Sequence, residues 1–146
     1  GIEAVRDNMT IQYQEVKLFL YDKLVEAAVY YGIFPEVEGG LAPQNPKNLR
    51  LRGSFRNFRM NPASDEENIL SGEVVAEILY EPGEFESADF LLDRVIGVFS
   101  PGQGELQNNA YRILTSSAAL MEQKTEGKYL RTGVSIQITV WGVHDD

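Results

Sequence analysis

The sequence predicts an α+β fold, with two main helices on one face of a mostly antiparallel sheet of four to five strands. Three observations support it. Two segments carry apolar residues at helical spacing, several others alternate apolar with polar residues, and the elements follow the order α-β-β-α-β-β. Because the alternating strands have only one apolar side each, we expect both helices to cover that side.

The first helix is expected over Thr10 to Tyr31, with Thr10 as its cap. Its apolar residues recur three and four positions apart and form one stripe: Val16, Leu20, Leu24, Ala27 and Tyr31. We expect Gly32 to end the helix in a left-handed conformation. A short strand over residues 33–37 and a loop rich in glycine and proline should follow.

The first long strand is expected over Leu49 to Met60. Up to Phe55, apolar residues alternate with arginine and serine, which makes one face of the strand apolar and the other basic. The alternation breaks at residues 57–59, where we expect a β-bulge.

An acidic, turn-rich segment over residues 61–72 is expected to form a mobile hairpin loop. Ile69 and Leu70 are an apolar pair inside it, and we expect this pair to become ordered against a partner. A purely hydrophilic hairpin tip is the competing interpretation. The second strand, over residues 73–80, is mostly apolar and should therefore lie at the centre of the sheet.

The second helix is expected over Ala88 to Phe99, with Ser87 as its cap. Four of its apolar residues should face the sheet: Leu91, Leu92, Val95 and Phe99. The last two strands are expected over residues 111–121, with an interruption at 115–117, and over residues 129–143. The final strand has the most regular alternation in the chain, so one of its faces should be buried.

The composition excludes several functions. The chain has 146 residues, no cysteine, one histidine and a net charge of -9. Its length predicts a single domain over residues 10–146, after a flexible leader or cloning remnant over 1–9. Without cysteine, and with His144 alone, no metal site, cofactor or activated nucleophile is expected, so we expect no enzyme. No segment approaches the ~20 apolar residues that span a membrane.

The most informative local feature is a basic run over residues 47–59, which holds five positive charges and no negative one. In an acidic chain, such a run favours an interface with an acidic partner. A solvated outer face is the simpler alternative. A nucleic-acid site is a third, since Phe55 and Phe58 interleave with the arginines, although Phe55 belongs to the apolar face. The predicted interface residues are Arg50, Arg52, Arg56, Arg59, Ile69 and Leu70.

Two blocks of this chain resemble the tail terminator proteins of long-tailed bacteriophages. They are GEVVAEILYEPGEFESADFLLDRVIGVFSPG and RILTSSAALMEQKTEGKYLRTGVSIQITVWGV. In that family a strand passes through a Pro/Gly turn into a helix of the pattern A-x-x-L-x-D/E-x-I-x-x-x-F. The second block is similar to the family's terminal hairpin. The helix positions are held here by Ala88, Leu91, Asp93, Val95 and Phe99.

The resemblance implies a structural virion protein that needs no cofactor. Terminators form a homo-oligomeric ring, generally a hexamer, which caps the head-proximal end of the tail tube, stops its polymerisation and joins it to the head. The implied partners are further copies of the chain, the tail tube protein and a head-completion or connector protein, with no membrane. DNA would pass through the lumen without sequence-specific binding, and the protein would be made in the cytoplasm of the bacterial host.

Other functions remain open on the sequence. Another head-completion or minor tail protein would share this length and element order. A small ligand-binding or regulatory module would use a cleft between the first helix and the sheet. An acid-catalysed hydrolase would need two carboxylates held across a cleft, and no motif in the chain fixes such a pair.

Overall fold

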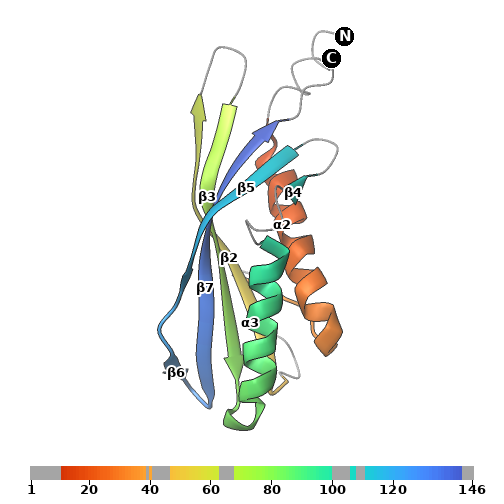
Figure 1. Ribbon diagram of the computed structural model, residues 1–146, viewed down its shortest axis with the longest axis vertical. Helices are drawn as coiled ribbons and strands as arrows, with labels where there is room; N and C mark the ends of the chain where they lie inside the picture. Colours follow the sequence, from red (N-terminus) through yellow and green to blue (C-terminus); the bar gives the residue numbers. More distant parts are fainter. Residues whose placement is uncertain are drawn as a thin grey trace.

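The computed structural model describes residues 11–38, 40, 47–62, 68–99, 106–107 and 111–142. In these ranges two helices lie on one face of a seven-stranded sheet (Figure 1), which confirms the predicted α+β class and element order. The helices are α2 (Tyr13–Ala28) and α3 (Phe85–Phe99), with 3-10 segments η1 (Val29–Tyr31) and η2 (Pro82–Glu84). The strands are β1 (Glu36–Val37), β2 (Leu49–Pro62), β3 (Asn68–Tyr80), β4 (Leu106–Gln107), β5 (Tyr111–Leu120), β6 (Lys124–Glu126) and β7 (Tyr129–Gly142).

The sheet has the order β1-β2-β3-β7-β5-β4, and β6 also pairs with β7. β1 and β2 are parallel, and every other described pair is antiparallel. The strand predicted to be central, β3, lies between β2 and β7. The four long strands and β1 match the predicted strands. β4 and β6 are short additions, β4 beside β5 and β6 beside β7.

Helix α2 packs through its predicted apolar stripe. Val16, Leu20 and Leu24 are completely buried. The helix tightens into η1, and Gly32 ends it at a φ of 67°, as predicted. Gln12 occupies the cap position without a side-chain hydrogen bond. The predicted cap, Thr10, and the predicted leader lie outside the described residues.

Helix α3 begins earlier than the sequence predicts. Pro82 starts the 3-10 turn η2, which continues directly into α3 at Phe85, so Ser87 lies inside the first helical turn. The prediction of Ser87 as the cap was therefore wrong. The buried stripe of the helix is close to the expected one, and its members are Ala88, Leu91, Val95 and Phe99.

An arginine ties the two helices together. Nε of Arg94 in α3 donates to the carbonyl of Ala27, at 2.9 Å, and its Nη2 donates to the carbonyl of Glu26, at 3.2 Å. These carbonyls lie in the last turn of α2, which carries no basic residue of its own. A cation there satisfies free carbonyl groups and complements the helix dipole.

The hairpin between β2 and β3 is longer than predicted. β2 extends to Pro62 and β3 begins at Asn68, so Ile69 and Leu70 are strand residues and their prediction as loop residues was wrong. Leu70 is only 3% exposed and lies opposite Val140 of β7. Ladder pairing on both sides of β3 and burial of Leu70 account for the additional strand residues. Residues 63–67 lie outside the described ranges.

The predicted bulge in β2 is confirmed. Arg56 pairs with Glu73 and Arg59 pairs with Ser71, so two residues of β2 stand opposite one residue of β3. Asn57 has a φ of 57°, the left-handed conformation that asparagine tolerates better than most residues. Since directly paired residues share a face, the bulge places Arg59 on the same face as Arg56.

The bulge also turns Phe58 toward the helices. A Cβ atom at Gly72 would stand 2.6 Å from the Phe58 ring, so the ring lies directly over this glycine. The same ring contacts Tyr13 in the first turn of α2, with 5.3 Å between centroids. Phe58 is therefore part of the packing between the sheet and helix α2. Of the two phenylalanines, the sequence pattern assigns only Phe55 to the apolar face of this strand.

The last hairpin follows the prediction closely. β5 is interrupted between Thr115 and Ser117, and a turn at Gly127 joins β6 to β7. In β7 the residues Val134, Ile136, Ile138 and Val140 are buried at every second position. No helix in the described ranges is long and apolar enough to cross a membrane.

Candidate interaction surface

Helices α2 and α3 lie on one face of the sheet, and we call the opposite face the open face (Figure 1). The strand register places all four predicted arginines there. Their neighbours across the sheet are Glu73 and Glu77 of β3 and Arg131, Ser135 and Gln137 of β7.

Arg50 forms a two-point ion pair within the chain. Its Nε and Nη2 donate to the two carboxylate oxygens of Glu36, at 2.8 and 2.6 Å, and its guanidinium lies 5.1 Å from the centroid of the Tyr129 ring. The hydrogen bond to Glu36 raises the pKa of Arg50. A bidentate pair of this kind fixes both side chains and compensates the charge of the guanidinium within the chain.

Arg52 belongs to a larger cluster, which we call the Glu77 network: Arg52, Glu77, Glu126 and Arg131. Arg52 Nε donates to Glu77 Oε1, at 3.1 Å, and its Nη1 and Nη2 each donate to Glu126, at 3.0 Å. Arg131 Nη1 donates to the second Glu77 oxygen, at 3.1 Å. The Glu77 side chain is only 9% exposed, so it depends on both arginines for compensation of its charge.

The hydrogen bonds in this network shift its ionisation. The pKa of Glu126 is lowered, first by its hydrogen bond from Arg52 and then by the positive charges of Arg52, Arg131 and Arg50. The pKa of Arg52 is raised, with the same hydrogen bond as the main cause. Both shifts favour the charged forms, so the ion pair between Arg52 and Glu126 persists at neutral pH.

Glu73 is held by neutral donors. Asn57 Nδ2 donates to one of its oxygens, at 2.9 Å, while Ser135 Oγ and Gln137 Nε2 donate to the other, each at 2.9 Å. Glu73 pairs directly with Arg56 in the ladder, but its carboxylate is already engaged by these three groups. This leaves Arg56 without the carboxylate nearest to it across the sheet.

Arg56 and Arg59 are consequently the accessible part of the basic strand. Arg56 Nε lies 3.9 Å from a Glu38 oxygen, a pair in which the side chains are 48% and 66% exposed. Arg59 is exposed and has no ion pair among the described residues. The structure thus separates the predicted arginines into two internally paired residues and two accessible ones. Their role as an interface stays a prediction.

The predicted apolar pair is separated in the same way. Leu70 is buried in the core, and Ile69 is half-buried opposite Asn61 on the open face. Sequence reasoning did not identify Glu77 as the partner of the arginines. The available signal was a carboxylate between apolar neighbours, Ala76 and Ile78, which at a central position of a sheet requires a compensating partner on the same face.

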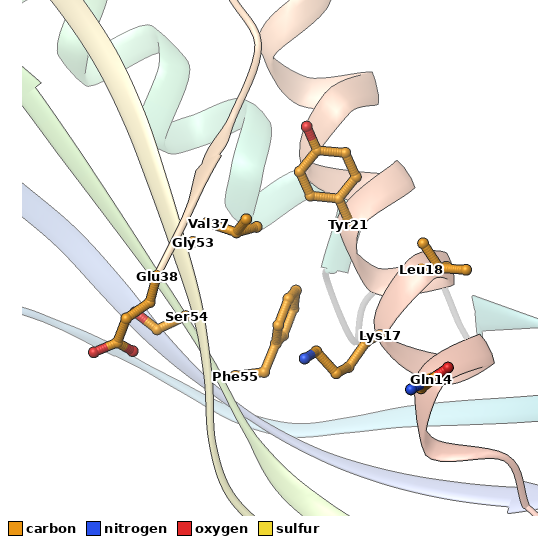
Figure 2. A pocket seen from close by; sticks show the side chains of 9 residues that line it. All are labelled: Gln14, Lys17, Leu18, Tyr21, Val37, Glu38, Gly53, Ser54 and Phe55. Carbon is orange, nitrogen blue, oxygen red and sulfur yellow. The ribbon is translucent and has the colours of Figure 1, made fainter. Parts of the chain in front are cut away.

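A groove of about 520 Å³ opens between α2 and β2, at the point where β1 ends. We call it the α2–β2 groove. Figure 2 shows Phe55 directed from the strand toward the helix, and the Lys17 side chain extended toward Phe55, while the Glu38 carboxylate points away. Its lining residues are Gln14, Lys17, Leu18, Tyr21, Val37, Glu38, Gly53, Ser54 and Phe55. Leu18 is 64% exposed, which gives the groove an apolar rim.

The described residues contain no group of three or more histidine, cysteine or carboxylate side chains placed to hold a metal ion. Their carboxylates on the open face are bound to arginines or neutral donors, as described above.

Comparison with known proteins shows a shared fold. No protein-family profile matches the chain, and no curated protein matches its sequence. A solved protein chain that carries no functional name superposes with a TM-score of 0.64 at 11% identity, over 94% of this chain and 99% of that chain. A chain from the virion of a native gene transfer agent particle superposes with a TM-score of 0.56 at 12% identity, over 85% and 92%.

Proposed function

We propose that this chain is a structural component of a phage-like particle and acts by assembly, without catalysis. The observation that carries this proposal is its superposition on a chain from a gene transfer agent virion, which extends over most of both chains. A match at 12% identity concerns the fold, so the step from fold to role is ours.

Within such a particle, we assign the chain to the head-proximal end of the tail. There it would form a ring, hexameric as in tail terminators, that stops tube polymerisation and offers a surface to the head. The support for this finer role is the terminator-like pattern of α3 and of the β5–β7 hairpin. Its partners would be neighbouring copies, the tube protein and a head-completion or connector protein, and DNA would pass through the lumen without base-specific contacts.

The charge distribution suits this role. The chain has a net charge of -9, yet Arg56 and Arg59 present exposed positive charge on the open face. An acidic surface on a neighbouring copy or on the last tube ring would complement them. Arg50 and Arg52 are already neutralised by carboxylates of the same chain, so we assign them to the stability of the fold.

The test is charge reversal at the accessible arginines. The double variant Arg56→Glu/Arg59→Glu should keep its circular dichroism spectrum and lose at least tenfold in ring formation or in the ability to stop tube growth. Ring formation is measured by light scattering across concentration and salt, and tube growth by electron microscopy of tail tube protein polymerised with and without the variant.

The matched control is Lys23→Glu/Lys128→Glu, which changes the net charge equally on helix α2 and on the β6–β7 turn. This control should assemble and cap like the unmodified protein. A folded Arg56→Glu/Arg59→Glu variant with unchanged assembly and capping would remove these arginines from the mechanism. Tubes that grow equally long with and without the unmodified protein would contradict the capping role itself.

The α2–β2 groove favours a second candidate, a small ligand-binding module. Its volume of about 520 Å³ lies within the usual range for small-molecule sites, and it combines apolar walls with the Lys17 amine. A module of this kind should stay monomeric and gain thermal stability with a ligand. Thermal shift against anionic metabolite mixtures, together with the light-scattering mass, separates it from the assembly proposal.

A further inference from the structure

We infer that copies of this chain join edge to edge. In this arrangement β5 of one copy adds to the free edge of β2 in the next, and Leu120 enters the α2–β2 groove. The inference deepens the proposed function, because it rests on self-association and names the surfaces that carry it.

The first of these surfaces is the outer edge of β5. Within the described ranges, strand β4 pairs with Arg112 and Ile113, and no described strand pairs with that edge from Leu114 to Leu120. Residues 116–120 are all exposed, and Leu120 is 70% exposed. The run from Ile113 to Met121 contains neither a charged residue nor proline. Natural proteins usually protect a free strand edge with such residues, so an unprotected edge is suited to pairing with another chain.

The second surface is the outer edge of β2. Strand β1 pairs with Arg52 and Gly53 only, and the Glu38 amide makes the last contact by donating to the Gly53 carbonyl, at 3.1 Å. From Ser54 onward, no described strand pairs with this edge of β2. The free segment starts at the α2–β2 groove, which Ser54 and Phe55 help to line.

The directions of the two edges are compatible. β2, β3, β7 and β5 alternate in direction across the sheet, so a β5 strand placed beside the next copy's β2 runs antiparallel to it and continues the alternation. Each free segment begins after a short strand, β1 or β4, that covers the N-terminal side of its edge. In antiparallel pairing, each short strand lies beyond the end of the other copy's free segment.

The face on which Leu120 lies gives the pairing a register. Leu120 is paired with the buried Val134 and therefore projects toward the helix side of the sheet. In a sheet that continues into the next copy with its helices on the same side, Leu120 enters the groove beside Phe55 (Figure 2). There it would cover the exposed apolar rim formed by Leu18 and Val37.

Charge favours unlike edges over like edges. Two β2 edges related by a twofold axis would bring Arg56 and Arg59 of both copies onto one face, where like charges in adjacent strands destabilise the pair. Two β5 edges would pair without using the groove. A contact between unlike edges leaves one edge of each type free at the ends, so it propagates, and it closes into a ring where the rotation between neighbouring copies brings the last copy back to the first.

Disulfide trapping tests the inferred register, because the chain contains no cysteine of its own. With Leu120 opposite Phe55, Ala119 lies opposite Arg56 on the open face. Facing residues in antiparallel strands have Cα atoms ~4.5–5.5 Å apart, which a disulfide can bridge. The variants are Arg56→Cys, Ala119→Cys and the double variant. Arg56→Cys introduces no negative charge and keeps Arg59, and the mass of each variant under reducing conditions is measured first.

After oxidation, the mixture of the two single variants should yield cross-linked dimers, and the double variant should yield a ladder of larger oligomers. Each single variant by itself should stay unlinked. A dimer from Ala119→Cys alone would replace our pairing with a twofold contact between β5 edges. Assembled but unlinked double variant would overturn the edge pairing and leave the proposed ring function standing.

A second variant addresses the groove without cysteine. Leu120→Asp, at an exposed position, should keep the fold and weaken self-association at least tenfold. Phe90→Asp on α3 is the control, since Phe90 is 62% exposed and lies away from both edges. Equal self-association of the Leu120→Asp variant and the unmodified protein would overturn the inference, as would an equal loss in both variants.

Discussion

The two halves of strand β2 carry the same kind of residue with opposite results. In the first half, Leu49 to Ser54, the arginines are bound to carboxylates that arrive from β1, β3 and β6. In the second half, Phe55 to Pro62, β1 has ended and the nearest carboxylate, Glu73, is engaged by neutral donors. A strand's own pattern therefore assigns an arginine to a face, while the neighbouring strands decide whether it is available.

The largest expected effect comes from Glu77 of β3, which binds Arg52 in the first half of β2. Glu77→Gln removes a nearly buried carboxylate and leaves the half-buried Arg131 guanidinium without a carboxylate partner, while Arg52 keeps its pair with Glu126. We expect the free energy of unfolding in urea to fall by about 3 kcal/mol. The matched change for the second half of β2 is Glu38→Gln. It removes the exposed ion pair with Arg56, at 3.9 Å, and should cost under ~1 kcal/mol. Equal losses in the two variants would erase the distinction between the halves.

A glycine beside the same network gives the next effect. Gly133 pairs with Glu77, and a Cβ atom there would press on the backbone carbonyl of Ala76 and stand 3.0 Å from Met121 Sδ. Gly133→Ala should therefore lower the free energy of unfolding by about 2 kcal/mol. Gly97 in α3 has no neighbour within 4 Å of its added Cβ, so Gly97→Ala should stabilise by ~0.5–1 kcal/mol. A tolerated Gly133→Ala would show that β3 and β7 have room to separate.

The smallest effect is the acid response of Glu126. Its pKa is lower in the folded protein than its ordinary value of 4.5, so the folded state binds this proton more weakly than the unfolded state does. The resulting stability is fully present above pH ~4.5 and is lost as the pH falls through the folded pKa. Because this side chain is 48% exposed, solvent screening should keep the contribution under ~1 kcal/mol. In the Glu126→Gln variant, the urea midpoint of unfolding should change less between pH 5 and pH 3 than in the unmodified protein. An unchanged pH dependence would contradict the pairing with Arg52.

Periodicity was sufficient for most of the fold. The stripe of α2, the alternation of β7 and the bulge in β2 are local patterns, and each predicted its element correctly. The start of β3 was not predictable in this way, because Leu70 is held by a pairing with Val140 that is distant in sequence. The start of α3 was missed for a local reason, since the 3-10 turn at Pro82 leads into the helix and makes a separate cap unnecessary.

The candidate surface was predicted only in outline. The arginine pattern identified the correct strand and one shared face, but the availability of each arginine depends on Glu36 and Glu126, which parallel pairing of β1 and the β6–β7 hairpin bring to β2. The cleft expected between the first helix and the sheet corresponds to the α2–β2 groove. The unprotected edge of β5 was visible as an uncharged run, yet its meaning depends on which strands lie beside it.

The position of β3 and β7 at the centre of the sheet has a consequence for the order of folding. β2 with β3, and β5 and β6 with β7, are hairpins of near neighbours, whereas the central ladder joins Tyr80 to Leu130 and Ile69 to Trp141. Contacts between distant residues form late, so we expect the two hairpins to exist before the central ladder closes. During that interval the chain exposes two additional strand edges, the inner edges of β3 and β7. Both strands are rich in hydrophobic residues that are buried in the folded protein. Aggregation during synthesis should therefore be governed by how quickly this central seam closes, and less by the stability of the finished protein.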